Sequence, residues 1–159
     1  MKESGQTQAA VTIIDDAEVL MEEEADWLYS IASELSKKTG WSVSAVTCDE
    51  DSQLNATADN GILCQVDVSD GAVLFTANGS AENYFDTNRR EEIIKEAQKP
   101  IEEQDYTQSL YLMLLGADKS YEAGEIAHTQ TSIWIITGTA ALCIILFIYS
   151  FIKIRRMKR

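Results

Sequence analysis

Residues 59–77 read DNGILCQVDVSDGAVLFTA, and this stretch decides the fold. It contains two apolar runs, Ile62–Val68 and Ala72–Ala77, whose β-branched and aromatic residues favour strands. Ser69-Asp70-Gly71 joins the two runs, and an Asp-Gly pair tolerates the positive φ angles of a tight hairpin turn. The sequence therefore predicts a β-hairpin in the middle of the chain.

An amphipathic helix is predicted upstream of this hairpin, over Met21–Lys38. Acidic residues occupy its first turns and lysines its last, which suits the helix dipole, and Gly40 marks its end. Asp15 or Asp16 is expected to cap its start. Its apolar face follows the 3, 4 and 7 spacing of a helix and comprises Leu20, Trp27, Leu28, Ile31, Ala32 and Leu35.

The remaining elements complete a small α/β domain over residues 11–122. Trp41–Cys48 alternates as a strand does, and the β-branched Val11–Ile14 is expected to be an extended lead-in segment. Asn88–Lys99 and a segment opened by Asp105 are predicted helices, whereas residues 1–10 are polar and expected to be disordered. The predicted order is helix, three strands and two helices. We expect a small αβα sandwich with a short mixed sheet.

The predicted domain is followed by a long uncharged, apolar segment. Ile133–Ile152 reads IWIITGTAALCIILFIYSFI, and a helix of this uncharged length spans a bilayer core of about 30 Å. We predict a transmembrane helix here, joined to the domain by a tether at residues 123–132 and followed by a basic tail at residues 153–159. The tail contains Lys153, Arg155, Arg156, Lys158 and Arg159.

The basic tail predicts the topology. Lysine and arginine beside a span remain in the cytoplasm, so the domain is expected to lie outside the cell, anchored in the cell membrane by a single pass. Residues 1–16 show no charged segment leading into an apolar one, so no signal peptide is visible. The alternative is a tail-anchored protein that faces the cytosol. We favour the exported arrangement.

The basic tail and the remainder of the chain have opposite net charges. The whole chain has 13 Lys and Arg against 26 Asp and Glu, a net charge of −13. Without the five cations of the tail the remainder carries 8 − 26 = −18. An acidic surface repels polyanions, which argues against a nucleic-acid partner.

The side chains offer little catalytic chemistry. The single histidine, His128, falls in the predicted tether, so a Ser/His/Asp or Cys/His arrangement lacks its base. Cys48 and Cys64 fall in predicted strands and are interpreted either as one disulfide or, preferably, as two buried thiols. The carboxylates at the edges of loops suit calcium or magnesium, but each is also a common helix cap or turn residue.

Five motifs in order resemble the TPM domain family over residues 11–122. The strongest match is Asp59-Asn60-Gly61-Ile62-Leu63, which is similar to the family's turn into its central strand. The others are Asp15-Asp16-Ala17-Glu18-Val19-Leu20, Thr39-Gly40-Trp41, Asn78-Gly79-Ser80 with Phe85-Asp86, and Gln104-Asp105-Tyr106.

The resemblance implies an αβα sandwich in a protein that is often exported and membrane-anchored. Some members resemble acid phosphatases, some bind calcium, and some are accessory factors of membrane complexes. Carried over by motif, the candidate metal ligands are Asp15, Asp59, Asn60, Asp86 and Asp105. Three departures lie near the implied cleft: Glu18 in place of glycine, Asn78-Gly79-Ser80 in place of a Gly-aromatic-Gly turn, and a loop at Asp49–Ala58 in place of a helix.

Two functions remain open at this point. The favoured one is an extracytoplasmic binding or accessory module that engages a protein partner, with or without a divalent cation. The other is a weak calcium- or magnesium-dependent phosphatase, in which Asp15 and Asp59 hold the cation and Asp86 acts as the base. The sequence does not indicate an oligomeric state.

Overall fold

The computed structural model describes residues 9–49 and 59–126. The chain divides into two units, residues 1–121 and 122–159, and of the second unit only residues 122–126 are described, as helix. Helix therefore occupies the first residues of the predicted tether. The predicted transmembrane helix and basic tail lie outside the described residues, as do His128 and residues 1–8. Within the described ranges no helix is both long and apolar enough to cross a membrane.

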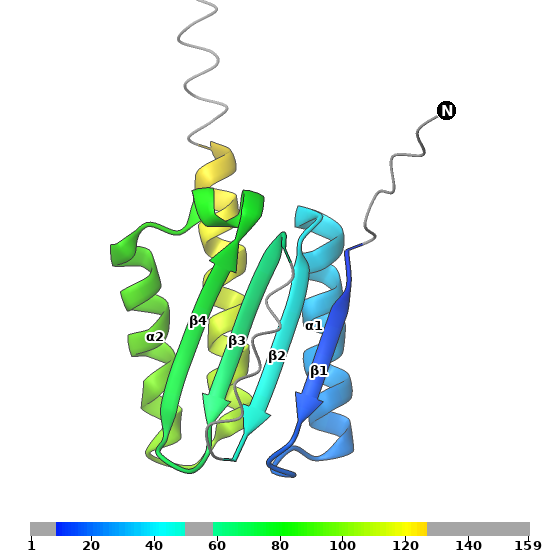
Figure 1. Cartoon of the computed structure of the whole chain (residues 1–159), viewed down its shortest axis with the longest axis vertical. Helices are drawn as coiled ribbons and strands as arrows, with labels where there is room; N and C mark the ends of the chain where they lie inside the picture. Colours follow the sequence, from blue (N-terminus) through cyan, green and yellow to red (C-terminus); the bar gives the residue numbers. More distant parts are fainter. Residues whose placement is uncertain (1–8, 50–58, 127–159) are drawn as a thin grey trace, which may run out of the picture. The chain divides into compact units, whose positions relative to one another are not determined.

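The first unit is built on a four-stranded mixed sheet (Figure 1). The strands lie in the order β1 (Val11–Asp15), β2 (Ser42–Cys48), β3 (Gly61–Asp67) and β4 (Ala72–Asn78). The first three are parallel, and β4 is antiparallel to β3. The predicted hairpin is confirmed, and Gly71 in its turn has a φ of 69°.

The lead-in segment is a strand of the sheet, which corrects the predicted element order. Strand β1 pairs with β2 from Val11 opposite Val43 to Asp15 opposite Thr47. A run of this length carries too little periodicity to be assigned by itself. It becomes a strand because β2 offers a ladder of backbone donors and acceptors.

Helices α1 (Glu22–Thr39) and α2 (Thr87–Ile101) agree with prediction to within one or two residues at each end. A 3-10 helix, η1 (Gly79–Tyr84), precedes α2, and residues 106–126 form a further helix. The expected cap of α1 by Asp15 or Asp16 is wrong. Met21 is the N-cap, and the Glu24 carboxylate accepts its backbone N–H at 2.8 Å.

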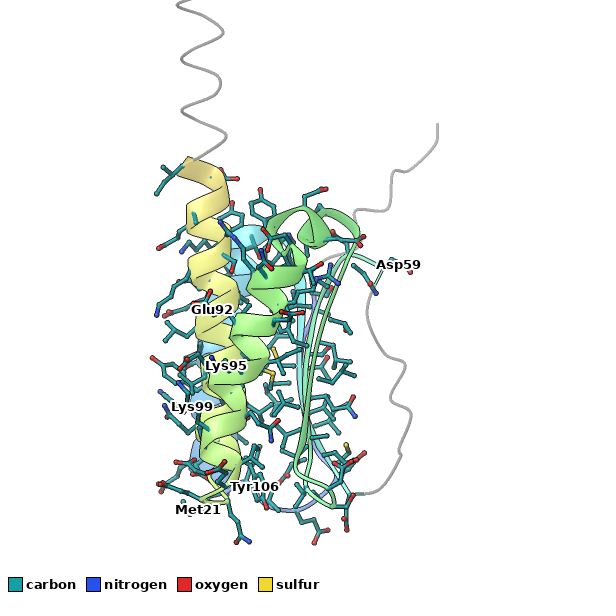
Figure 2. All side chains as sticks on the ribbon, turned by 90° about the vertical axis from the view of Figure 1, so that its left-hand side faces the viewer. Met21, Asp59, Glu92, Lys95, Lys99 and Tyr106 are labelled. Carbon is teal, nitrogen blue, oxygen red and sulfur yellow. The ribbon has the colours of Figure 1, made fainter. Side chains whose placement is uncertain are left out.

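The described helices of the first unit lie on one face of the sheet. Figure 1 shows α1, α2 and the helix from residue 106 behind the strands, and the turned view of Figure 2 separates the helices from the sheet. The α/β class and the mixed sheet are confirmed, but the described residues form two layers rather than the predicted αβα arrangement.

The core lies between the sheet and these helices. Trp41, 1% exposed, contacts the rings of Tyr84, Phe85 and Tyr121 at centroid distances of 5.2–5.8 Å. The helix from residue 106 contributes Leu110, Met113, Leu114 and Ala117 to this core, all of them fully buried. Trp27, which was expected on the buried face of α1, is 43% exposed and instead lies against Tyr111 at 5.0 Å.

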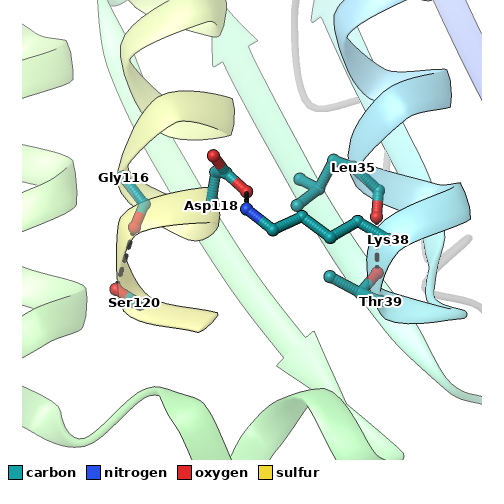
Figure 3. A network of polar contacts seen from close by, with 6 residues as sticks. All are labelled: Leu35, Lys38, Thr39, Gly116, Asp118 and Ser120. Atoms are coloured by element: carbon teal, nitrogen blue, oxygen red, sulfur yellow. Dashed lines mark hydrogen bonds and ion pairs between the residues drawn. The ribbon is translucent and has the colours of Figure 1, made fainter. Parts of the chain in front are cut away.

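Helix α1 and the helix from residue 106 are also joined at the surface (Figure 3). Lys38 Nζ lies 2.6 Å from Asp118 Oδ1, and both side chains are more than a third exposed. Exposed ion pairs of this kind contribute about 0.2–1 kcal/mol. Packing across the core therefore holds the two helices together far more than this pair does.

Candidate functional site

The five candidate ligands divide between two opposite ends of the sheet. Asp15 ends β1 opposite Thr47, whereas Asn60 directly precedes Gly61, which pairs with Ser42. Ser42 and Thr47 are five residues apart on β2, or about 16 Å at 3.3 Å per residue. Figure 2 likewise shows Asp59 at the end of the domain opposite Met21 and Tyr106. Asp15 and Asp59 therefore lie too far apart to hold one cation together.

Asp15 holds the turn between β1 and α1. Its carboxylate accepts the backbone N–H groups of Val19 at 3.1 Å and Leu20 at 3.0 Å. It also accepts the hydroxyl of Thr47 at 2.5 Å, from the neighbouring strand. The turn includes Glu18, the residue in place of the family's glycine, at a φ of 53°. Because both carboxylate oxygens are engaged, Asp15 acts as a structural anchor.

Asn60 joins the segment before β3 to the turn after β4. Its Oδ1 accepts hydrogen bonds from the backbone N–H of Ser80 at 2.8 Å and from the Ser80 hydroxyl at 2.6 Å. Gly79, at a φ of 65°, lies so close that a Cβ would meet Asp59 O at 2.6 Å. The Asp59–Gly61 and Asn78–Ser80 motifs are therefore in contact at one end of the β3–β4 hairpin, and we call this pair of motifs the latch.

Asp86 and Asp105 are helix caps. Asp86 Oδ1 accepts the N–H of Arg89 at 2.8 Å at the start of α2. Asp105 Oδ1 accepts the N–H of Gln108 at 2.9 Å at the start of the next helix. Both interactions satisfy donors that a helix terminus leaves unpaired, so the turn-and-cap interpretation describes these two residues.

Asp59 differs from the other four. It is exposed, and its carboxylate makes no hydrogen bond or ion pair to another described residue. Among the residues that the structure describes, no three carboxylate, thiol or imidazole side chains gather closely enough to hold a metal ion. Asp59 is thus the one candidate whose carboxylate has no hydrogen bond or ion pair to the residues that the structure describes.

Two other carboxylates have altered titration. A hydrogen bond from the Ser69 hydroxyl, at 2.6 Å, lowers the pKa of Asp67. The Lys99 ammonium, bonded to both oxygens of Glu96, lowers the pKa of Glu96. Both carboxylates are at the surface, and these local contacts favour their ionised forms. Neither residue lies in one of the family motifs.

The two cysteines of the domain are free and buried. Cys64 lies opposite Ala45 in the strand register, on the face that packs on the helices, whereas Cys48 lies on the other face. Burial raises the pKa of the Cys64 thiol. The preferred interpretation, two buried thiols, is confirmed, and the disulfide alternative is not.

Sequence reasoning missed the partners of the motif residues. Thr47 bonds Asp15 from the next strand, and Ser80 bonds Asn60 from a turn 20 residues away. Ser80 was assigned to its own motif, but nothing in the sequence linked it to Asn60. Only the strand order brings these pairs together.

The fold and these contacts define a small α/β domain whose motif residues hold its turns and helix starts. The family model of the TPM domain matches residues 13–119, and the chain belongs to this family. The fold is similar to the solution NMR structure of the N-terminal domain of a protein from P.gingivalis. The TM-score is 0.61 at 16% identity, over 70% of this chain and 82% of that one. Among curated proteins no match was found.

Proposed function

We propose that the protein is a single-pass membrane-anchored TPM domain that acts as an extracytoplasmic binding or accessory module for a protein partner. One observation carries the choice of a binding role over catalysis. Asp15, Asn60, Asp86 and Asp105 already accept hydrogen bonds that hold turns and helix starts. The resemblance suggested these four residues as metal ligands, whereas in the structure they stabilise turns and helix starts.

The donor set does not fit a resident calcium or magnesium ion among the described residues. Calcium takes six to eight oxygen ligands, and magnesium prefers octahedral coordination with at least one or two carboxylates. Of the five candidates only Asp59 has a carboxylate free of hydrogen bonds to described residues. We therefore propose a binding role that does not depend on a cation.

Membrane anchoring rests on the sequence. The uncharged Ile133–Ile152 has the length of a span, and the cations of residues 153–159 favour a cytoplasmic C-terminus. Cleavage of the domain by protease added to intact cells is the expected result. Protection of the domain until the cells are lysed would show that it faces the cytosol.

Catalysis is tested on the full chain in detergent. Aryl-phosphate hydrolysis is measured with calcium, with magnesium and with a chelator, beside Asp59→Asn and the matched surface variant Asp70→Asn. We expect no turnover and no rise in melting temperature on adding either metal. Metal-dependent turnover that disappears in Asp59→Asn but not in Asp70→Asn would replace the binding role with the phosphatase.

A further inference from the structure

Helix α1 and the helix from residue 106 do not close completely against each other. The ring of Trp27 lies against that of Tyr111 at one point of their interface, and Lys38 binds Asp118 further along both helices (Figure 3). The two helices therefore run in the same direction. Between these two contacts they leave a cavity of about 180 Å³.

The cavity is lined mainly by apolar side chains. The buried Leu35 and Leu114 contribute to it, and its other apolar residues, which are partly exposed, are Ile31, Tyr111 and Leu115. Of these three, Leu115 does not pack against the core. A cavity of about 150 Å³ lined by such side chains is large enough to bind benzene. This cavity can therefore accept one aromatic or branched aliphatic side chain.

One carboxylate in the lining of the cavity is unpaired. Glu34 is exposed and forms no hydrogen bond or ion pair with another described residue. The other charged residues of the lining are Lys38 and Asp118, which are bonded to each other. The lining therefore offers one negative charge beside an apolar cavity.

The surrounding charge also favours a cationic ligand. The chain before the basic tail carries −18. Lys119, which follows Asp118, lies toward α2, where the ammonium of Lys99 and then that of Lys119 lower the pKa of Glu96. An acidic surface attracts cationic partners and repels a second copy of itself. Charge complementarity therefore favours a basic partner over a second copy of this chain.

We propose that this groove, formed by residues 27–38 of α1 and residues 111–118 of the next helix, binds a basic amphipathic helix of a partner protein. An apolar side chain of the partner enters the cavity, and a neighbouring lysine or arginine pairs with Glu34. A groove of this kind suits a helix whose apolar residues recur at i, i+4 and i+7. Trp27, 43% exposed and one turn before Ile31, extends the apolar surface for a second anchor. The inference rests on the proposed binding role and gives it a surface and a partner chemistry.

The test uses the full chain in a neutral detergent and a synthetic probe. The probe is an amphipathic peptide of alanine, leucine and lysine, about 14 residues or four helical turns long, with a benzophenone side chain at one apolar position. We expect it to bind at least tenfold more tightly than the same peptide with glutamate in place of lysine, and to crosslink to residues 27–38 and 111–118. Equal binding of the two peptides, or crosslinks confined to other parts of the chain, would overturn the proposal.

Two pairs of variants test the groove itself. Leu115→Trp places a larger side chain in the cavity and should raise the dissociation constant of the lysine peptide at least tenfold. Leu112→Trp, on the same helix but outside the lining, should leave it unchanged. Glu34→Lys should raise it about fivefold by reversing the charge beside the cavity, whereas Glu91→Lys, the same change on α2, should not. Circular dichroism would verify that each variant is folded.

Other occupants of the groove give different results. A wild-type dimer that is lost in Leu115→Trp would assign the groove to a second copy, and a wild-type chain that does not bind the lysine peptide would show that a basic helix cannot enter. Either result overturns the proposal. Unchanged peptide binding in both Glu34→Lys and Leu115→Trp also overturns it but leaves the proposed binding role intact. That role fails instead if the aryl-phosphate assay shows metal-dependent turnover that is lost in Asp59→Asn.

Discussion

Asn60 and Ser80, 20 residues apart, join two motifs of the domain through two hydrogen bonds. One amide oxygen of Asn60 accepts both the backbone N–H and the hydroxyl of Ser80. The link ties the segment entering β3 to the turn leaving β4, at the end of the sheet where Asp59 lies. A motif that suggested a ligand site is thereby explained as part of the fold.

Asn60→Ala should lower the free energy of unfolding by about 0.5–1.5 kcal/mol, because the exposed Ser80 donors lose their acceptor and bond to water instead. Chemical denaturation of the full chain in detergent measures the change. Asn88→Ala, at an exposed position of α2, is the matched control and should change stability by less than about 0.5 kcal/mol. Equal losses of unfolding free energy in the two variants would show that the Asn60–Ser80 hydrogen bonds do not stabilise the domain.

Gly79→Ala should destabilise the domain more than Gly40→Ala does. Both glycines have positive φ, 65° and 74°, so each alanine incurs a left-handed conformational cost of about 1–2 kcal/mol. At Gly79 the new Cβ would also meet Asp59 O at 2.6 Å and Asn60 Oδ1 at 2.8 Å, whereas at Gly40 nothing lies within 4 Å. Thermal unfolding of the two variants measures the difference, and a larger loss at Gly40 would contradict the close approach.

The pKa of Asp67 should rise toward its usual value in Ser69→Ala, because the hydroxyl that lowers it is removed. A folded-state pKa below the unfolded value stabilises the protein above the unfolded pKa, and this stabilisation is lost as pH falls through the folded pKa. Carboxyl NMR titration measures the shift directly. Ser80→Ala, which leaves the Asp67 environment unchanged, is the control, and an equal shift in both variants would refute the assigned cause.

Cys48 and Cys64 should resist modification by a thiol reagent in the folded protein. Both are fully buried, and the raised pKa of Cys64 keeps its thiol protonated, whereas the thiolate is the reactive form. The chain has a third cysteine, Cys143, so the measurement uses the variant Cys143→Ser, in which these two thiols are the only ones present. We expect both to react on unfolding, and rapid reaction of either in the native state would show that its burial is transient.

Much of the fold could be read from local patterns. The spacing of apolar residues in Glu22–Thr39 and the Asp-Gly turn between β3 and β4 each specify their element through neighbours in sequence. Strand β1 could not be assigned with the same certainty. It is short, and its backbone bonds are made with β2, about 30 residues further along the chain.

The candidate site was predicted only as a set of residue types. Acidic and amide residues at loop edges are read equally well as ligands or as caps, because both roles need the same oxygen atoms. Asp86 and Asp105 proved to be caps once the following helix starts were known. Asp15 or Asp16 was expected to cap α1, but Asp15 holds the preceding turn and bonds Thr47 on β2.

By itself the sequence determined the α/β class, the helices, the hairpin and the TPM family, since these depend on periodicity and on motifs a few residues long. Only the tertiary structure decided that the helices cover one face, that Asp15 and Asp59 lie at opposite ends of the sheet, and that Asn60 bonds Ser80. The reason is physical: strand order and register set which distant residues meet, and these arise from pairing between segments that no local pattern records.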